Sequence, residues 1–559
     1  MKRLHAAAMA MLITAPLSLT AGRASAASPT WASSVAFTNV VASSPTTGGG
    51  YPVPPGERVP DAGTCGAGPF NANHSESWLS VKPGTEDLVG TSKFFFDKYS
   101  TFYMFYVGAY QMPNGTPSSN NQVQGYDCLS TSTQAMPPSW TNSTDPNSDF
   151  DTKGRVYQTM LPYNSFFDAT RLHPDGEIDM SYSDDMGRHW IKGNHGVPLE
   201  PPNNASALQL GHVEDKQWVA VNHIVGNKYQ DHVYAAWAVF NGSGGGIKVR
   251  MAVSRDRGVN FAKPVTISTP SQVTAGATYV LPEIDAAGNL FVSVVSFPPN
   301  GDPSTIYVAR STDDGRTFSA FVPITTATVP PGEVYPNTRF RSGIIENFAA
   351  SPTYANHLYL TYEDWDAAAG QADVKFTQST DGGATWTAPV VVNDNVDASG
   401  SPTDQFQPSI AAGPDGAVAI VFYDRRQACP NDKSILPADA GRTNFCIDTS
   451  LQAYKDSGSG AVPAGSNVRI SQFAWDPEQP GQHLGGLSQY PCAGATDPCA
   501  KGSGFIGDYF ALAISAGNIY ALMVSTHYPS TVTADEGGKV YYQQQVLATV
   551  PRADFGAGY

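Results

Sequence analysis

The sequence predicts an all-β fold of radially repeated sheets, a β-propeller, and two observations lead to that prediction. First, the pattern Ser-x-Asp-x-Gly-x-x-aromatic occurs four times, each time directly after a strand-like run, and the copies begin at Ser183, Ser254, Ser311 and Ser379. One hairpin type repeated at long intervals is typical of radial repeat folds. Second, 53 Gly and 43 Pro among 559 residues suit many short strands joined by tight turns.

Each of these octets predicts the turn of a β-hairpin. Ser and Asp side chains can bond the turn backbone, and Gly takes a conformation that a Cβ would oppose. The octet resembles the Asp-box, or bacterial neuraminidase repeat, of sialidases and their relatives. That resemblance implies a propeller in which the octet joins the third and fourth strands of a blade. We therefore interpret the octet aspartates as structural: Asp185, Asp256, Asp313 and Asp381.

The number of blades follows from pairs of apolar strands that repeat along the chain. We find seven such pairs, from SESWLSVKPGTEDLVGTS to FIGDYFALAISAGNIYALMVS. The last unit has only one further strand, KVYYQQQVLATV, so we expect residues 34–41 to supply its outer strand and remove an exposed edge. Residues 27–73 then form a closing strand and a Pro- and Gly-rich loop, and residues 74–559 form one propeller. Sialidases proper have six blades, which leaves six blades with an appendage as the alternative.

The first 26 residues predict an export signal. Lys2 and Arg3 precede an apolar run, and Ala24-Ser25-Ala26 supplies a small-residue cleavage site. No later segment is apolar and long enough to span a bilayer. We expect a secreted monomer, and the net charge of −16 argues against a nucleic-acid partner.

The six cysteines fit an exported chain, because an even number there usually means disulfides. Cys492 and Cys499 are separated by a short loop, Cys429 and Cys446 would close an insertion, and Cys65 and Cys128 remain as the third pair. Other connectivities stay open. No Cys-x-x-Cys metal pattern occurs and the histidines are scattered, so we expect no metal cofactor; the oxygen-rich EDWD segment at 363–366 is where a structural calcium ion could bind.

The resemblance also implies where a ligand would bind. In this superfamily it is the face that collects the starts of the innermost strands and the ends of the second strands. Glycoside cleavage commonly uses two carboxyl groups, and sialidases use a Tyr–Glu pair and three arginines. The candidate catalytic residues are Asp424, Tyr509, Asp508 and Glu283, with Tyr335 as a second attacking tyrosine. The candidate substrate-binding residues are Arg339, Arg341, Arg425, Arg426, Asp215, Trp218 and Asp364.

The number of blades and one motif separate this chain from true sialidases. The Arg-Ile-Pro motif of their first blade is absent from SESWLSV, and TRFRSG at 338–343 is the nearest echo. Neighbours such as Asp424-Arg425-Arg426 also commonly tie blades together, because ion-pair networks can be structural. We expect a hydrolase of an extracellular, anionic or neutral, glycan. A polysaccharide lyase, or a propeller that only binds glycans or proteins, is the alternative.

Overall fold

The computed structural model describes residues 31–43, 74–95, 105–122, 142–164, 175–202, 212–241, 246–269, 277–297, 303–338, 340, 346–394, 401, 403–479, 506–533, 538–556 and 558–559. Within these ranges the chain is built from β-strands and short 3-10 turns, with no α-helix. No helix in the same ranges has the length and apolar character needed to cross a membrane. The 3-10 turns are Pro113–Gly115, Asn194–Gly196, Pro331–Glu333, Pro414–Gly416 and Arg552–Phe555.

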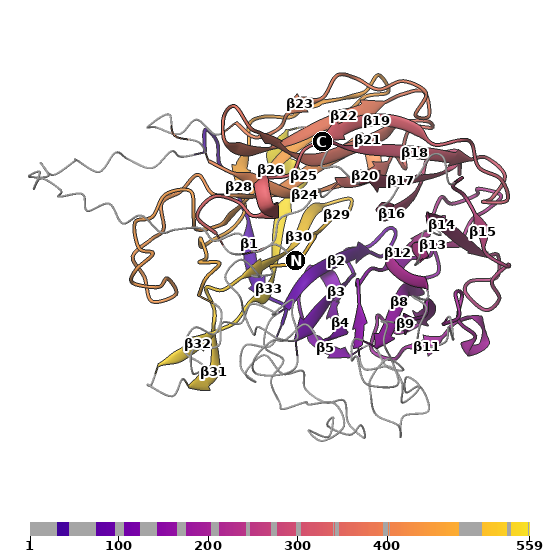
Figure 1. Cartoon of the computed structure of the whole chain (residues 1–559), viewed down its shortest axis with the longest axis horizontal. Coiled ribbons are helices and arrows are strands. Elements are labelled where there is room, and N and C mark those ends of the chain that lie inside the picture. Colours follow the sequence, from indigo (N-terminus) through magenta and orange to yellow (C-terminus); the bar gives the residue numbers. More distant parts are fainter. Residues whose placement is uncertain are drawn as a thin grey trace, which may run out of the picture.

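Seven sheets follow one another around a central axis in chain order, which confirms a seven-bladed propeller (Figure 1). Blade 1 contains β2 (His74–Val81), β3 (Leu88–Phe95), β4 (Phe105–Met112) and β5 (Ser119–Gln122). Blade 2 contains β6 (Asn142–Thr144), β7 (Asp149–Phe150), β8 (Val156–Asn164), β9 (Asp175–Gly176), β10 (Asp179–Ser183) and β11 (Ile191–Lys192). Blade 3 contains β12 (His212–Val221), β13 (Val233–Asn241), β14 (Gly246–Ser254) and β15 (Val265–Thr266).

Blades 4 to 7 repeat the same antiparallel meander. Blade 4 contains β16 (Ala277–Ile284), β17 (Leu290–Ser296), β18 (Ser304–Ser311) and β19 (Val322–Ala327). Blade 5 contains β20 (Glu346–Ala350), β21 (Leu358–Asp366), β22 (Gln371–Ser379) and β23 (Val390–Val391). Blade 6 contains β24 (Gln405–Ala412), β25 (Ala417–Asp424), β26 (Asp448–Asp456), β27 (Ala461–Pro463) and β28 (Val468–Arg469).

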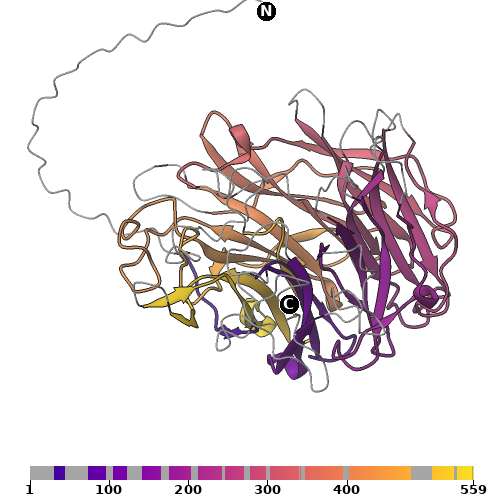
Figure 2. The same cartoon turned by 60° about the horizontal axis from the view of Figure 1, so that its bottom comes forward.

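Blade 7 closes the ring with strands from both ends of the chain. It contains β29 (Ala511–Ile514), β30 (Asn518–Ser525), β33 (Gln544–Pro551) and, as its outer strand, β1 (Thr38–Val41). Strand β1 pairs antiparallel with β33, Thr38 opposite Thr549, so the expected closure by an N-terminal strand is confirmed. Figure 2 shows the last strands of the chain beside the first blade. A separate hairpin joins β31 (Pro529–Thr533) to β32 (Lys539–Tyr541).

The four octets form nearly identical turns between the third and fourth strands of blades 2 to 5. In the turn at 311–318, the Ser311 hydroxyl donates to the Asp313 carboxylate at 2.9 Å, and Asp313 accepts the Thr317 amide at 2.9 Å. The Gly315 amide donates to the Ser311 hydroxyl at 3.0 Å, and Gly315 has φ +70°. These bonds are local, and they hold the turn without help from a ligand.

The core lies between neighbouring blades rather than in one central mass. Phe376 of blade 5 packs on Tyr454 of blade 6, with ring centroids 4.8 Å apart. Beside them the Asp456 carboxylate accepts hydrogen bonds from His357 at 2.6 Å and Tyr359 at 2.7 Å. Apolar contact and buried polar pairs therefore fix each blade against the next.

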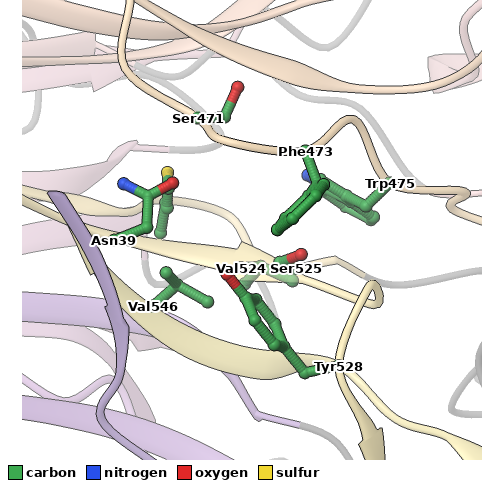
Figure 3. A pocket seen from close by; sticks show the side chains of 9 residues that line it. Asn39, Ser471, Phe473, Trp475, Val524, Ser525, Tyr528 and Val546 are labelled. Atoms are coloured by element: carbon green, nitrogen blue, oxygen red, sulfur yellow. The ribbon is translucent and has the colours of Figure 1, made fainter. Parts of the chain in front are cut away.

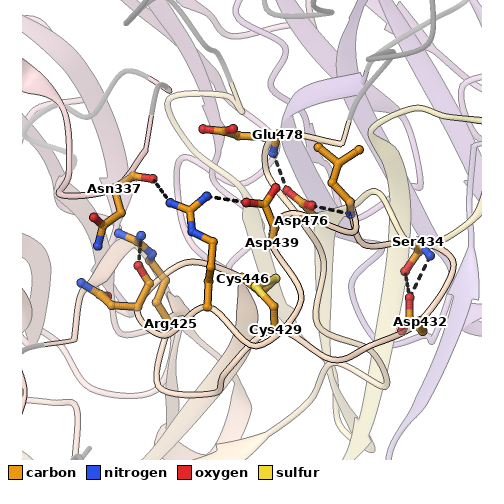
Figure 4. The surroundings of a disulfide bond; sticks show 12 residues. Asn337, Arg425, Cys429, Asp432, Ser434, Asp439, Cys446, Asp476 and Glu478 are labelled. Atoms are coloured by element: carbon orange, nitrogen blue, oxygen red, sulfur yellow. Dashed lines mark hydrogen bonds and ion pairs between the residues drawn. A yellow bond between two sulfur atoms is a disulfide. The ribbon is translucent and has the colours of Figure 1, made fainter. Parts of the chain in front are cut away.

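One expected disulfide is formed, between Cys429 and Cys446 (Figure 4). It closes the insertion after β25, where the Asp439 carboxylate pairs with Arg442 and the Asp476 carboxylate accepts the Leu436 amide at 3.0 Å. Cys65, Cys128, Cys492 and Cys499 lie outside the described residues, as do residues 1–26 and most of 27–73, so their predicted roles stay predictions.

Candidate functional site

The innermost strands share a backbone irregularity close to their first residues. The pairing register shifts at a β-bulge in four of them, between Ser75 and Trp78, Asp215 and Trp218, Thr278 and Leu281, and Phe406 and Ser409. The first bulged residue has a positive φ in every case: 50° at Glu76, 48° at Lys216, 55° at Tyr279 and 45° at Gln407. Asp145, between the short strands β6 and β7 of blade 2, has φ 55°. Bulges re-aim side chains, and the contacts below show that these meet at the axis.

We call Glu76, Asp145, Lys216, Tyr279, Gln407 and Asp508 the inner ring. Its centre is the ammonium of Lys216, which lies 3.0 Å from Asp508, 3.2 Å from Asp145 and 3.8 Å from Glu76. Those partners come from blades 7, 2 and 1, so one lysine from blade 3 ties four blades together. The rings of Tyr279 and Tyr509 lie 5.3 Å and 5.5 Å from the same ammonium. A second lysine, Lys93, pairs with Glu76 at 2.6 Å.

The inner ring and its neighbour Asp215 contain carboxyl groups whose pKa values move in opposite directions. Burial opposes ionisation of Asp145, but the ammonium groups of Lys216 and Lys93 outweigh it and lower the pKa of Asp145. Burial raises the pKa of Asp215 to about 7, against the opposing charge of Lys216 and with the help of the neighbouring Asp145 carboxylate. Burial likewise raises the pKa of Glu76. An ionised acid therefore lies beside a protonated one, the pairing that acid–base catalysis requires.

Asp215 is the most exposed carboxyl group of this cluster. It is half-buried, whereas Glu76, Asp145, Lys216 and Asp508 are each less than one-tenth exposed. Thr278 donates to its carboxyl group at 3.1 Å, and the Lys216 amide donates to it at 2.9 Å. These two bonds hold the carboxyl group in place, and Asp215 is the carboxyl group of this cluster that is not fully buried.

Directly beyond the inner ring, aromatic side chains pack across the axis. Trp78, Trp218 and Tyr509, from blades 1, 3 and 7, meet with ring centroids 4.6 Å (Trp78–Trp218), 5.0 Å (Trp218–Tyr509) and 6.4 Å (Trp78–Tyr509) apart. Leu281 and Phe348 complete this contact from blades 4 and 5. We call these five residues the aromatic plug. The Tyr509 hydroxyl donates to the Pro146 carbonyl at 3.1 Å, so Trp218 and Tyr509, expected to bind or attack substrate, serve here to pack the axis.

A second tyrosine–carboxylate pair lies between blades 5 and 6. The Tyr335 hydroxyl donates to Glu363 at 2.5 Å, and Glu363 also accepts the Gln407 amide at 2.9 Å. Burial raises the pKa of Glu363 to about 8. Tyr335 is 2% exposed and packs on Phe406, with ring centroids 4.6 Å apart. Tyr335 was among the expected attacking residues, and Glu363 is the partner that spacing along the chain did not identify.

Two of the four arginines expected to clamp a substrate carboxylate, Arg425 and Arg426, have partners within the protein. Arg425 is fully buried and binds Asp404 at 2.8 Å and the Pro336 carbonyl at 3.1 Å, and burial lowers its pKa to about 10. Arg426 binds Asp424 at 2.7 Å. Asp424 in turn accepts Ser450 and Gln405. Arg425, Arg426 and Asp424 therefore join strands of blade 6 to each other and to the segment at Pro336, whereas Asp508 pairs with Lys216.

Other expected site residues are dispersed. Asp364 pairs with Lys375 at 3.3 Å, and Asp366 caps the turn after β21, so the carboxylates of 363–366 have separate partners. Glu283 lies four residues beyond Tyr279 on β16, beyond the aromatic plug from Asp508. Arg339 and Arg341 lie outside the described residues. In the described ranges, no group of three or more His, Cys, Asp or Glu side chains could hold a metal ion.

A small pocket between blades 6 and 7 is not a competing site. Phe473, Trp475, Tyr528 and Val546 line it (Figure 3), but its volume of about 10 Å³ holds no more than one water molecule.

Glu76, Lys93 and the bulges were missed at the level of sequence. The signal was present in part: Glu76 stands two residues before Trp78, and Lys216 two residues before Trp218. Superposing the units on these tryptophans would have aligned the two bulges, but the same position holds Tyr279 in blade 4 and Gln407 in blade 6, so no residue type marks it.

Comparison with known proteins adds only distant likenesses. No known family model matches the chain, and no curated protein matches it. Among solved structures, the Hadza microbial sialidase Hz136 is 13% identical over 81% of this chain and 75% of that one, with a TM-score of 0.38. An α-L-arabinanase of Penicillium chrysogenum complexed with arabinobiose is 11% identical over 77% and 97%, with a TM-score of 0.40. The ulvan lyase of family PL25 is 11% identical over 71% and 82%, with a TM-score of 0.38. At such values the function must be argued from this chain's own site.

Proposed function

We propose that this protein is a secreted enzyme that hydrolyses glycosidic bonds of an extracellular glycan, with Asp215 as the general acid. The observation that carries the proposal is the pair formed by Asp145, whose pKa is lowered, and Asp215, whose pKa is raised to about 7, at the side of Lys216. The proposed export is supported by the N-terminal sequence pattern and by the Cys429–Cys446 disulfide.

The roles follow from exposure and charge. Asp215 is half-buried and, with a pKa of about 7, still carries its proton in part at neutral pH, so it can give that proton to the departing glycosidic oxygen. Asp145 and Asp508 lie within 3.2 Å of Lys216 and are nearly inaccessible. We assign them no contact with substrate: the Asp145 carboxylate helps to keep the proton on Asp215, and this proton assists the departure of the leaving group in the oxocarbenium-like transition state of glycoside cleavage.

The charge of the substrate depends on residues that the structure does not describe. Both inner lysines are paired with carboxyl groups, and Arg425 and Arg426 are paired within blade 6. An anionic substrate would therefore need Arg339 or Arg341, and we propose them as its ligands. A lyase must neutralise the carboxylate of a uronate with a cation. The cations named above already pair with carboxyl groups of the protein, so among the described residues they do not favour lyase activity.

The experiment is a screen of the purified mature protein on anionic and neutral polysaccharides, followed by Asp215→Asn on the substrate that is cleaved. We expect the substitution to lower kcat/KM by about 10²- to 10⁴-fold, with the melting temperature nearly unchanged because a protonated carboxyl and an amide are close in shape. Asp184→Asn is the control, since Asp184 pairs with Arg155 on the surface of the octet face and its side chain is 54% exposed.

Three outcomes would contradict the proposal. If Asp215→Asn keeps full turnover, Asp215 is not the acid. Products that carry an unsaturated uronate, seen by their ultraviolet absorbance, would identify a lyase. Binding without turnover across the whole panel would identify a propeller that only recognises glycans. Light scattering on the same preparation tests the proposed monomer.

A further inference from the structure

The axis opens into a second cavity on the other side of the aromatic plug. Its volume is about 630 Å³, and all seven innermost strands contribute to its wall near their last residues. The first and third strands of a blade run in the same direction, so this end of the axis faces the side that carries the octet turns. Asp215 and the inner ring lie at the opposite end of the same strands, so the cavity is separate from the proposed active site.

The cavity has the composition of a small-molecule site. Trp78 and Trp218 form its floor, and its walls come mainly from Ala220, Ala350, Ala412 and other small or aliphatic residues. Sites of roughly 300–1,000 Å³ with apolar walls and few polar groups are the usual form of ligand pockets. The volume and lining therefore suit a compact ligand with an apolar body.

Two carboxyl groups lie inside this apolar wall. Of the described residues, none forms an ion pair with Glu283, and its carboxyl interacts with the backbone N–H of Ala350 and with the charge of Asp149. Asp149 accepts the Val221 amide at 2.7 Å, and His223 Nδ1 lies 3.9 Å from it. Burial raises the pKa of both carboxyl groups. Asp149 has only the ring of His223 as a basic neighbour, and among the described residues Glu283 has no cationic partner.

We propose that this cavity binds a small organic cation, a primary ammonium on an apolar body, whose charge is held by Glu283 and Asp149 while the body lies on Trp78 and Trp218. An ammonium supplies the missing positive charge, and a tryptophan face attracts a cation. A metal ion fits less well, because hard cations require six or more oxygen ligands and no cluster of three ligating side chains occurs in the described ranges.

The remaining charged groups of the cavity lie near its mouth. Lys82 pairs with Asp87 at 3.7 Å, and the Asp415 side chain is 79% exposed at 4.0 Å from Arg552. With His223 these complete the titratable lining. The charges at the mouth thus balance one another, and Glu283 lies deeper in the cavity, with no cationic partner among the described residues.

The test is calorimetric titration of the full mature protein at pH 7 with 2-phenylethylamine and with 2-phenylethanol, which has the same body and no charge. We expect the amine to bind at least tenfold more tightly than the alcohol. Glu283→Gln should weaken the amine at least tenfold and leave the alcohol unchanged, whereas Asp415→Asn at the mouth should change neither. Equal affinity for amine and alcohol, no binding of either, or full affinity in Glu283→Gln would overturn the proposal.

A second variant places the ligand without altering a charge. Ala412→Phe adds a ring to the partly exposed wall of the cavity and should abolish binding of the amine. Unchanged binding in Ala412→Phe would show that the amine binds elsewhere and would also contradict the proposal. Asp215→Asn should bind the amine as the unaltered protein does, so this site and the proposed active site can fail independently.

Discussion

The octet turns and the inner ring repeat around the same axis in opposite ways. The octets repeat their residues: Ser, Asp and Gly form the same bonds in four blades, as the Gly187 and Gly383 amides show by donating to Ser183 and Ser379 at the same 2.9 Å. The inner ring repeats only its backbone. Four of its residues share a bulge with φ between 45° and 55° and have four different side chains: Glu76, Lys216, Tyr279 and Gln407. Repeated chemistry therefore indicates a structural role, whereas repeated geometry with varied chemistry indicates a site.

The largest loss of stability that would distinguish the inner ring from the octet turns is expected at Lys216. Lys216→Met leaves the Asp145 and Asp508 carboxylates buried without their cation, and should lower the free energy of unfolding at pH 7 by about 3–5 kcal/mol. The loss should be smaller at pH 5, because the stranded carboxyl groups take up protons. Urea denaturation at both pH values measures it. Lys82→Met is the matched control, since its pair with Asp87 is partly exposed and is worth less than about 1 kcal/mol.

The backbone of the ring is tested at Gly507. Gly507 has φ +104°, and a Cβ there would lie 2.7 Å from the Glu76 amide nitrogen. Gly507→Ala should cost about 3 kcal/mol, from conformational strain together with the clash. In Gly226→Ala the φ is +80° and the Cβ meets nothing within 4 Å, so only the strain of about 1 kcal/mol should remain. Equal losses in the two variants would show that the close approach to Glu76 has no role.

The pH dependence of activity tests the ring's chemistry. The pKa of Asp215 is about 7, well above its ordinary value, so the proton needed by a general acid is present below pH 7 and is lost above it. The kcat/KM of the enzyme should therefore fall about tenfold for each pH unit above 7. Stability should also fall as the pH rises from 4 to 7, because the unfolded chain ionises this carboxyl first. An activity that stays flat to pH 9 would exclude Asp215 as the acid.

The smallest effect is expected in an octet. Asp313→Ala removes the acceptor of the Thr317 amide and hydroxyl, and should cost about 1 kcal/mol without changing kcat/KM. Asp313→Asn keeps one acceptor oxygen and should lose less. Thermal denaturation and the standard activity assay measure both. A large loss of activity in Asp313→Ala, at unchanged stability, would remove the distinction between the two regions.

Local chemistry allowed the fold to be predicted from the sequence alone. Three sequence patterns predicted seven blades and the pairing of β1 with β33: the Ser-x-Asp-x-Gly turns, the paired apolar strands and the missing strand of the last unit. Hairpin turns and edge closure depend on residues that are near one another in the sequence, so their patterns can be recognised there. The Cys429–Cys446 disulfide could be predicted for the same reason, because it closes a short insertion.

Only the tertiary structure decided what each buried charge does. Lys216 meets Glu76, Asp145 and Asp508 from three other blades, and Arg425 pairs with Asp404 rather than facing a ligand. The sequence analysis grouped Glu283 with Asp508, yet the aromatic plug lies between them. Asp508 belongs to the inner ring together with Tyr279, and Glu283 lies four residues beyond Tyr279 on β16, roughly 13 Å further along the strand. A carboxyl group's role depends on burial and on the charges nearest to it in space, and those neighbours come from blades that are distant in sequence.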